Sequence, residues 1–224
     1  MTLELFDCDG KDYFFNLEKP FDHGYQANIY RIDDGRCLKH FIYMYSECND
    51  KTLRTISDMD LDGFYKIHDI LYDKNGKYSA YTMDYYYNDK NLDILTLPVE
   101  YTIENFRRLY KSILRLSKEG IRTIDLHSDN IILNNDGIVV IDVDLYSYFS
   151  YFDRYSVVDK NVETLYSLFR ELYRKMIFNF YNSDKKLDFK IIDDLFVPTD
   201  NIDLVCKKLV RYKRPIDYII SERK

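Results

Sequence analysis

The spacing of apolar residues changes near residue 90, and this change limits what the chain can fold into. Before it, apolar and polar residues alternate in several short segments, as in strands with one buried face. After it, apolar residues recur three and four positions apart over long segments, which predicts amphipathic helices. The sequence therefore predicts an α+β fold in which a small antiparallel sheet with one helix precedes a mainly α-helical part.

Two hairpins make up most of the predicted sheet. They are 28–43, with a turn at Asp33-Asp34-Gly35, and 64–84, with a turn at Asp73-Lys74-Asn75-Gly76. In both turns Gly supplies the positive φ that a tight hairpin needs. Between the hairpins, only 49–57 has a length suitable for a helix.

Two long helices are expected in the second part. In the first, Thr102 is a good N-cap residue and Gly120 suits the position after the last turn. The second is predicted over 161–178, where apolar residues form one stripe that packs against the core. From Asp184 onward we expect two or three short helices.

Length and charge exclude several classes of protein. A chain of 224 residues buries roughly 70% of its unfolded surface, enough for one solid core or for two small lobes that share a cleft. Its net charge of −6 provides no basic field for nucleic acid or an anionic membrane. The apolar runs are too short to span a bilayer and the chain does not begin as a signal peptide, so we expect a cytoplasmic protein of its own cell or a host cell. The four cysteines lack Cys-x-x-Cys spacing, which predicts reduced thiols rather than zinc ligands or disulfides.

The stretch from Asp125 to Asp142 carries the clearest sign of chemistry. Asp125 stands five residues before Asn130, Asn130 opens an apolar run, and Asp142 ends the strand that returns after Asp136-Gly137. Carboxylate and amide oxygens are ligands that Mg²⁺ prefers, so Asn130 and Asp142 are predicted to bind metal at the neck of a hairpin. Asp125, one loop away, is placed to receive a proton.

This pattern resembles the catalytic loop and metal-binding Asp of the protein-kinase-like fold. The resemblance implies ATP and Mg²⁺ as cofactors, Asn130 and Asp142 as metal ligands, and Asp125 as the catalytic base. Asp144 is a second candidate for the metal acid. His127 stands where protein kinases have Lys, similar to aminoglycoside-phosphotransferase-type enzymes. It is expected either to contact the moving phosphoryl group or to hold the loop.

The segment from Asp22 to Tyr30 resembles a reduced form of the kinase Gly-rich loop. Gly24 matches its middle glycine, Ala27 replaces an outer one, and Ile29 lies where the loop closes. The resemblance implies that backbone amides here cover phosphates. An inward-pointing Asp22 would repel them.

Two further segments follow in the order that the resemblance requires. Lys39 is implied to contact the α- and β-phosphates, with Glu47 as the helix acid that pairs with it and Asp50 as the alternative. Met83 is implied to lie behind the adenine. The backbone of Asp84 to Tyr86 would then supply the hydrogen bonds of a hinge, because the edge of adenine needs one donor and one acceptor.

These features together predict one kinase-like domain with an N-lobe of about 1–84, a hinge of about 84–90 and a C-lobe of about 91–224. The resemblance implies transfer of the γ-phosphoryl group of ATP to a hydroxyl, with a protein Ser/Thr acceptor favoured. A small-molecule kinase of the aminoglycoside or choline type remains open, as does a pseudokinase that only binds a partner. Thr123-Ile124-Asp125 replaces His-Arg-Asp, so no Arg next to the base would receive an activation-loop phosphate.

Overall fold

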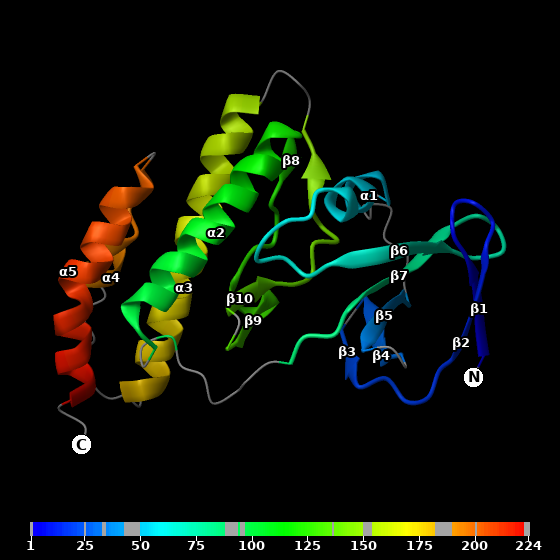
Figure 1. The fold of residues 1–224 in the computed structure, drawn as a ribbon, viewed down its shortest axis with the longest axis horizontal. Helices are drawn as coiled ribbons and strands as arrows, with labels where there is room; N and C mark the ends of the chain where they lie inside the picture. Colours follow the sequence, from blue (N-terminus) through cyan, green and yellow to red (C-terminus); the bar gives the residue numbers. More distant parts are fainter. Residues whose placement is uncertain are drawn as a thin grey trace.

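The computed structural model describes residues 2–24, 26–32, 35–42, 50–87, 94, 97–135, 137–149, 154–181, 190–199 and 201–221; at 154, 179–181, 191 and 212–221 it describes the backbone alone. The described residues form a curled antiparallel sheet with a short helix, followed by long helices and two small strand pairs (Figure 1). The predicted α+β class is therefore confirmed.

In the described residues the main sheet has seven strands, in the order β2-β1-β6-β7-β5-β4-β3, and each neighbouring pair is antiparallel. The strands are β1 (Thr2–Phe6), β2 (Asp12–Asn16), β3 (Asp22–His23), β4 (Ala27–Arg31), β5 (Arg36–Phe41), β6 (Ile67–Tyr72) and β7 (Tyr78–Asp84). The pairs β4–β5 and β6–β7 confirm the two predicted hairpins. The hairpin β1–β2 was not predicted, and it joins the sheet where Phe6 pairs with Tyr72.

The two faces of the sheet belong to different apolar clusters. Leu38 of β5 packs in a small cluster beneath the N-terminal hairpin, whereas Phe41 of β5 packs in the main core. Because side chains alternate along a strand, Lys39 shares the face of Phe41. Helix α1 (Asp50–Asp58) contacts β6 and buries Leu53 and Ile56 in the main core, and it lies within a residue of the predicted helix.

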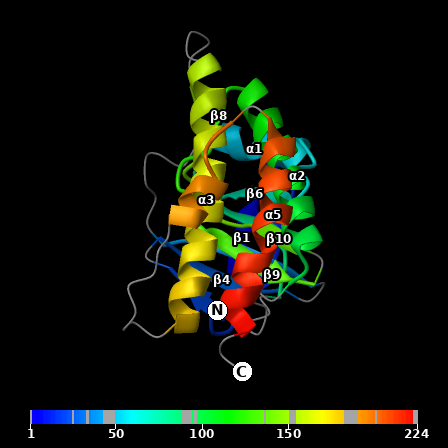
Figure 2. The ribbon, with the colours of Figure 1, turned by 90° about the vertical axis from the view of Figure 1, so that its left-hand side faces the viewer.

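The helical part contains α2 (Val99–Lys118), α3 (Arg154–Tyr181), α4 (Lys190–Leu195) and α5 (Ile202–Ser221), with strand pairs β8 (Ile121–Arg122)–β11 (Ser147–Tyr148) and β9 (Ile131–Asn134)–β10 (Gly137–Val140). Helices α2, α3 and α5 run alongside one another (Figure 2). The prediction that Thr102 caps α2 was wrong. The N-cap is Pro98, and Thr102 is buried inside the helix, where its hydroxyl accepts a hydrogen bond from Tyr173 at 3.2 Å. Gly120 does follow the C-cap, with a φ of +76°.

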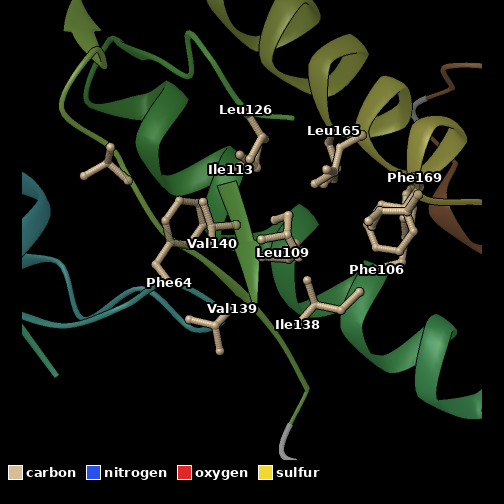
Figure 3. Packing of buried hydrophobic residues seen from close by; sticks show 14 of the residues in the cluster. Phe64, Phe106, Leu109, Ile113, Leu126, Ile138, Val139, Val140, Leu165 and Phe169 are labelled. Atoms are coloured by element: carbon tan, nitrogen blue, oxygen red, sulfur yellow. The ribbon is translucent and has the colours of Figure 1, made fainter. Parts of the chain in front are cut away.

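One apolar core joins the sheet to the helices. Phe64 precedes β6 and packs near Val140 of β10 and Leu109 of α2 (Figure 3). The backbone supports this junction, because Val140 N donates to Gly63 O at 2.8 Å and Tyr65 N donates to Val140 O at 3.0 Å. The β9–β10 hairpin is therefore fixed against the sheet. No helix within the described residues is both long and apolar enough to cross a membrane.

Candidate functional site

Lys39 of β5 contacts two acids that follow it by more than a hundred residues in the sequence. Its Nζ donates to Asp142 Oδ1 at 2.7 Å and to Asp144 Oδ2. Lys39 is only 7% exposed and Asp144 only 1% exposed, whereas the Asp142 side chain is 42% exposed. The structure thus brings Lys39 together with both candidates for the metal acid.

Burial and the neighbouring charges both shift the pKa values of these three groups. Burial raises the pKa of Asp144 to about 6; Lys39 opposes this rise and Asp142 adds to it. Burial acts most strongly and would raise the pKa of Asp142, but the charge of Lys39 together with hydrogen bonds from Lys39 and Asp144 outweighs it and holds that pKa below its usual range. Burial lowers the pKa of Lys39, yet the attraction of Asp144 and Asp142 gives a net rise. Near neutral pH the site therefore holds an ammonium and an exposed carboxylate.

A cavity opens beside this ion pair. Six of the predicted site residues line it, namely Ile29, Lys39, Met83, Asp84, Tyr86 and Asp142. Its remaining lining residues are Phe21, Asp22, Cys37, Tyr65, Tyr81, Tyr85, Ile132 and Ile141. The cavity is thus apolar over most of its wall and also presents a few charged groups, as is usual for sites that hold a small organic ligand.

The hinge segment at the cavity has most of its backbone donors occupied. Asp84 N donates to Lys66 O at 3.1 Å and Tyr85 N donates to Gly35 O at 3.0 Å. Tyr86 N donates to no residue in the described part of the chain. Tyr86 lines the cavity, and its N–H is the hinge donor that the described residues leave unused.

The structure does not bring Gly24 or Ala27 to the cavity. Gly24 N donates to Ala27 O at 2.9 Å, which closes the turn on itself. Ala27 is 4% exposed and lies in the main core, where it pairs with Phe41 of the next strand. A ligand in this cavity is thus covered by Asp22 and Ile29 from this segment rather than by a ring of glycine amides.

Glu47, the acid expected to pair with Lys39, lies outside the described residues. The alternative, Asp50, makes other contacts: it accepts a hydrogen bond from Tyr72 at 2.9 Å and lies 3.7 Å from Arg54. Asp50 is therefore not the partner of Lys39. The described partners of Lys39 come from the segment after β10 instead.

The loop that carries Asp125 holds its carboxylate from two sides. Asn130 Nδ2 donates to Asp125 Oδ2 at 3.1 Å and to Asp125 O at 2.8 Å. His127 Nε2 lies 3.2 Å from Asp125 Oδ1, and His127 Nδ1 accepts from Asp129 N at 3.3 Å. His127 Nε2 also lies within hydrogen-bond distance of Asn130 Nδ2, at 3.3 Å. The three predicted residues Asp125, His127 and Asn130 form one connected group.

Asn130 and Asp142 lie at the neck of the β9–β10 hairpin. Ile141 N donates to Asn130 O at 2.9 Å, so the residues that flank this bond leave the hairpin together. Asn130 binds Asp125 through its Nδ2, so its Oδ1 takes no part in that contact. No group of three or more His, Cys, Asp or Glu side chains in the described residues is arranged to hold a metal. An amide oxygen and a carboxylate fit Mg²⁺, which uses one or two carboxylates and keeps water and phosphate ligands.

Helix α3 supplies three contacts to this loop that sequence analysis did not single out. Asn161 is fully buried; its Oδ1 accepts from Thr123 N at 2.9 Å, and its Nδ2 donates to Ile121 O at 2.8 Å. Glu171 accepts from Ser128 Oγ at 2.6 Å and from Ser128 N at 3.2 Å. Lys175 donates to Asp129. The sequence did contain a signal for Asn161, which is a polar residue next to an apolar stripe. Buried polar groups almost always have hydrogen-bond partners, so this Asn could be expected to bind another segment.

Comparison with known sequences does not assign the chain to a family. The sequence matches no protein-family model, and no curated protein matches it significantly. The function must therefore be argued from the contacts of these residues.

Proposed function

We propose that this protein is a two-lobed, kinase-like phosphotransferase that moves the γ-phosphoryl group of ATP to a hydroxyl group, with Mg²⁺ as cofactor and a protein Ser/Thr residue as the favoured acceptor. The observation that carries the proposal is the contact of Lys39 with Asp142 and Asp144 at one side of an apolar cavity. Phosphoryl transfer depends on positioning and charge neutralisation. A buried ammonium and an exposed carboxylate beside an apolar cavity supply both.

The apolar part of the cavity suits adenine. Ile29 and Ile132 line it together with Met83, and apolar side chains of this size pack against a planar base. The N–H of Tyr86 supplies the donor that a ring nitrogen of adenine requires, and hinge carbonyl groups supply an acceptor for its amino group. Under this assignment the base lies at the hinge and the phosphates extend toward Lys39.

Lys39 provides positive charge for the phosphates. Its raised pKa keeps it protonated, and its burial strengthens its attraction for anions, because a charge is screened less inside a protein than in water. Bound Mg²⁺ would neutralise further phosphate charge, and Asn130 Oδ1 and Asp142 are the groups that would hold it.

Asp125 is the proposed base. Its carboxylate is about two-fifths exposed, with a side-chain exposure of 39%, so an acceptor hydroxyl can approach it. Asn130 donates to one of its oxygens and His127 Nε2 lies 3.2 Å from the other, and these contacts fix its direction. Of the two roles expected for His127, these contacts favour holding the loop. The proton of the hydroxyl passes to Asp125 as the oxygen attacks the γ-phosphorus.

A pseudokinase is the second candidate, and two features of the β3–β4 turn favour it. The Gly24 N–H is used within the turn, and the acidic residue Asp22 lines the cavity. Both features weaken the binding of phosphates by this segment. The contact of Lys39 with Asp142, together with an Asp125 carboxylate that Asn130 holds in place, favours the enzyme.

The direct test is incubation of the purified protein with γ-labelled ATP and Mg²⁺, alone, with generic protein acceptors and with small alcohols such as choline and an aminoglycoside. We expect label on protein. Label on a small alcohol alone would favour the small-molecule kinase. Absence of transfer to any acceptor, together with no change of melting temperature on addition of Mg-ATP, would rule out the enzymatic proposal.

A further inference from the structure

A groove on helix α3 lies directly beside the catalytic loop. It is lined by Ser167, Arg170, Glu171, Arg174 and Lys175. The loop forms its border, because Glu171 binds Ser128 and Lys175 binds Asp129. Asp129 follows Asp125 by only four residues, so the groove begins close to the proposed base.

The three cations of this groove meet as many carboxylates, Glu171, Asp129 and Asp193, but the charges are not all paired with one another. Glu171 directs both carboxylate oxygens to Ser128. Lys175 and Arg174 pair with Asp129 and Asp193, but these pairs are exposed, with side-chain exposures of 42 to 71%. Exposed pairs are weak and exchange readily with other anions.

Arg170 differs from the other two cations of the groove. Its Nη2 donates to the neutral Ser167 Oγ at 2.7 Å, and no carboxylate in the described part of the chain pairs with it. An arginine presents five N–H donors in a planar fork that matches a carboxylate. The groove therefore has one arginine available to an incoming anion and two more cations that can change partners.

We propose that this groove binds acidic side chains of the protein acceptor, next to the Ser or Thr whose hydroxyl lies at Asp125. This inference rests on the proposed phosphotransferase function and specifies its substrate class. The row from Ser167 to Lys175 extends roughly 12 Å along the helix, at about 1.5 Å per residue. A row of this length suits successive residues of a peptide better than one small anion. This preference for acidic side chains belongs to the groove alone, because the chain as a whole has a net charge of −6.

The test compares three fluorescent peptides with the same central Ser, flanked by Asp and Glu, by Ala, or by Lys. Binding is measured by fluorescence anisotropy and transfer by label from γ-labelled ATP. The parent protein is compared with Arg170→Glu, with Arg170→Lys, and with the control Lys160→Glu, an exposed residue of the same helix. Melting temperatures verify that each variant is folded.

We expect the acidic peptide to bind most tightly and to be phosphorylated with the highest kcat/KM. Arg170→Glu should weaken its binding by roughly fivefold to tenfold and lower the ratio of acidic to Ala-flanked kcat/KM, whereas Arg170→Lys should retain part of this preference. Lys160→Glu should change binding by less than about twofold.

Equal binding of the three peptides, or an equal loss in Arg170→Glu and Lys160→Glu, would overturn the assignment of the groove. If Mg-ATP still raised the melting temperature and label still reached protein, the phosphotransferase proposal would survive that failure. Tight binding of the acidic peptide without transfer to it would instead leave the groove as a binding surface and remove the enzymatic role. A hexose phosphate that displaced the acidic peptide at equal concentration would show that the site takes small anions, against the peptide assignment.

Discussion

Asp125 and Asp142 both have a left-handed backbone, with φ values of +67° and +61°. This conformation is uncommon for residues other than Gly, and it persists where surrounding contacts fix the chain. For Asp125 those contacts are visible: Asn130 binds its carbonyl group and its carboxylate. Two strained acids in one proposed site are consistent with side chains that are held in a fixed direction for function.

Asp125→Ala should lower turnover by about 10²-fold or more and leave the affinity for ATP nearly unchanged, because it removes the proposed base but no phosphate contact. Steady-state transfer of label and a separate ATP titration measure the two effects. Asp9→Ala, an exposed acid of the N-terminal hairpin, is the control. A collapse of ATP affinity in Asp125→Ala would contradict the role assigned to Asp125.

Asp144 should make folding stability depend on pH. Its pKa is raised by burial from the ordinary 3.8 to about 6, so its contribution to stability is complete below about pH 4 and is lost as the pH rises through about 6. Between about pH 4 and pH 6, the parent should therefore lose stability relative to Asp144→Asn. Urea unfolding of both proteins across this range measures the difference. If the stability curves of the parent and Asp144→Asn were parallel, Asp144 would not titrate in this range. The control is Asp159→Asn, on an exposed residue, whose curve should run parallel to that of the parent.

At the scale of single residues, order and spacing in the sequence were enough to identify four candidate site residues, Lys39, Asp125, Asn130 and Asp142. It could not show that Lys39 pairs with Asp142 and Asp144 rather than with Asp50, because strand alternation gives only the face of a side chain. The self-closed turn at Gly24 was equally hidden. The residue types of this segment do not show that the Gly24 N–H is bound to the carbonyl group of Ala27.

At the scale of elements, helix α3 supports the loop that carries Asp125 through side chains spread along its length. Asn161 holds the entry of the loop at Thr123, and Glu171 holds its middle at Ser128. The sequence predicted the apolar stripe of this helix but began the helix seven residues too late, at 161 instead of Arg154. It could not predict which loop the polar residues would meet, since that depends on tertiary packing.

Asn161→Ala should destabilise the protein by about 2–4 kcal/mol, because it leaves the buried Thr123 N–H and Ile121 carbonyl without their partners. Chemical denaturation measures this loss. Lys160→Ala, on the neighbouring exposed residue of the same helix, should change stability by less than about 0.5 kcal/mol. Equal effects of the two substitutions would mean that the contacts of Asn161 do not stabilise the fold.

Gly137, at the start of β10, offers a second test of an element. Its φ is +139°, and an added Cβ would collide with Arg108 Nη2 and Asn105 Oδ1. Gly76 also has a positive φ, +73°, but an added Cβ there meets nothing within 4 Å. Gly137→Ala should therefore cost about 2–4 kcal/mol, and Gly76→Ala only about 1 kcal/mol. Similar losses in thermal or urea unfolding would contradict the packing described around β10.

At the scale of the whole molecule, the sheet and the helices share one core, and the proposed cleft lies where they meet. The change of apolar spacing near residue 90 predicted the order of the two parts, because periodicity reports which faces are buried. It did not predict the β1–β2 hairpin, whose strands are short and lie at the edge of the sheet. Backbone hydrogen bonds of Val140 with Gly63 and Tyr65 hold β10, and with it the segment of Asp142, against the sheet, and local patterns do not encode such long-range contacts.

The central claim is that one cleft binds ATP with Mg²⁺ through Lys39 and Asp142. Calorimetric titration of ATP into the parent and into Asp142→Ala, each with Mg²⁺ and with EDTA, tests it most directly. We predict that Mg²⁺ strengthens ATP binding by the parent and has no such effect on Asp142→Ala. Equal affinity of the parent for ATP with and without Mg²⁺, or no binding at all, would contradict the claim.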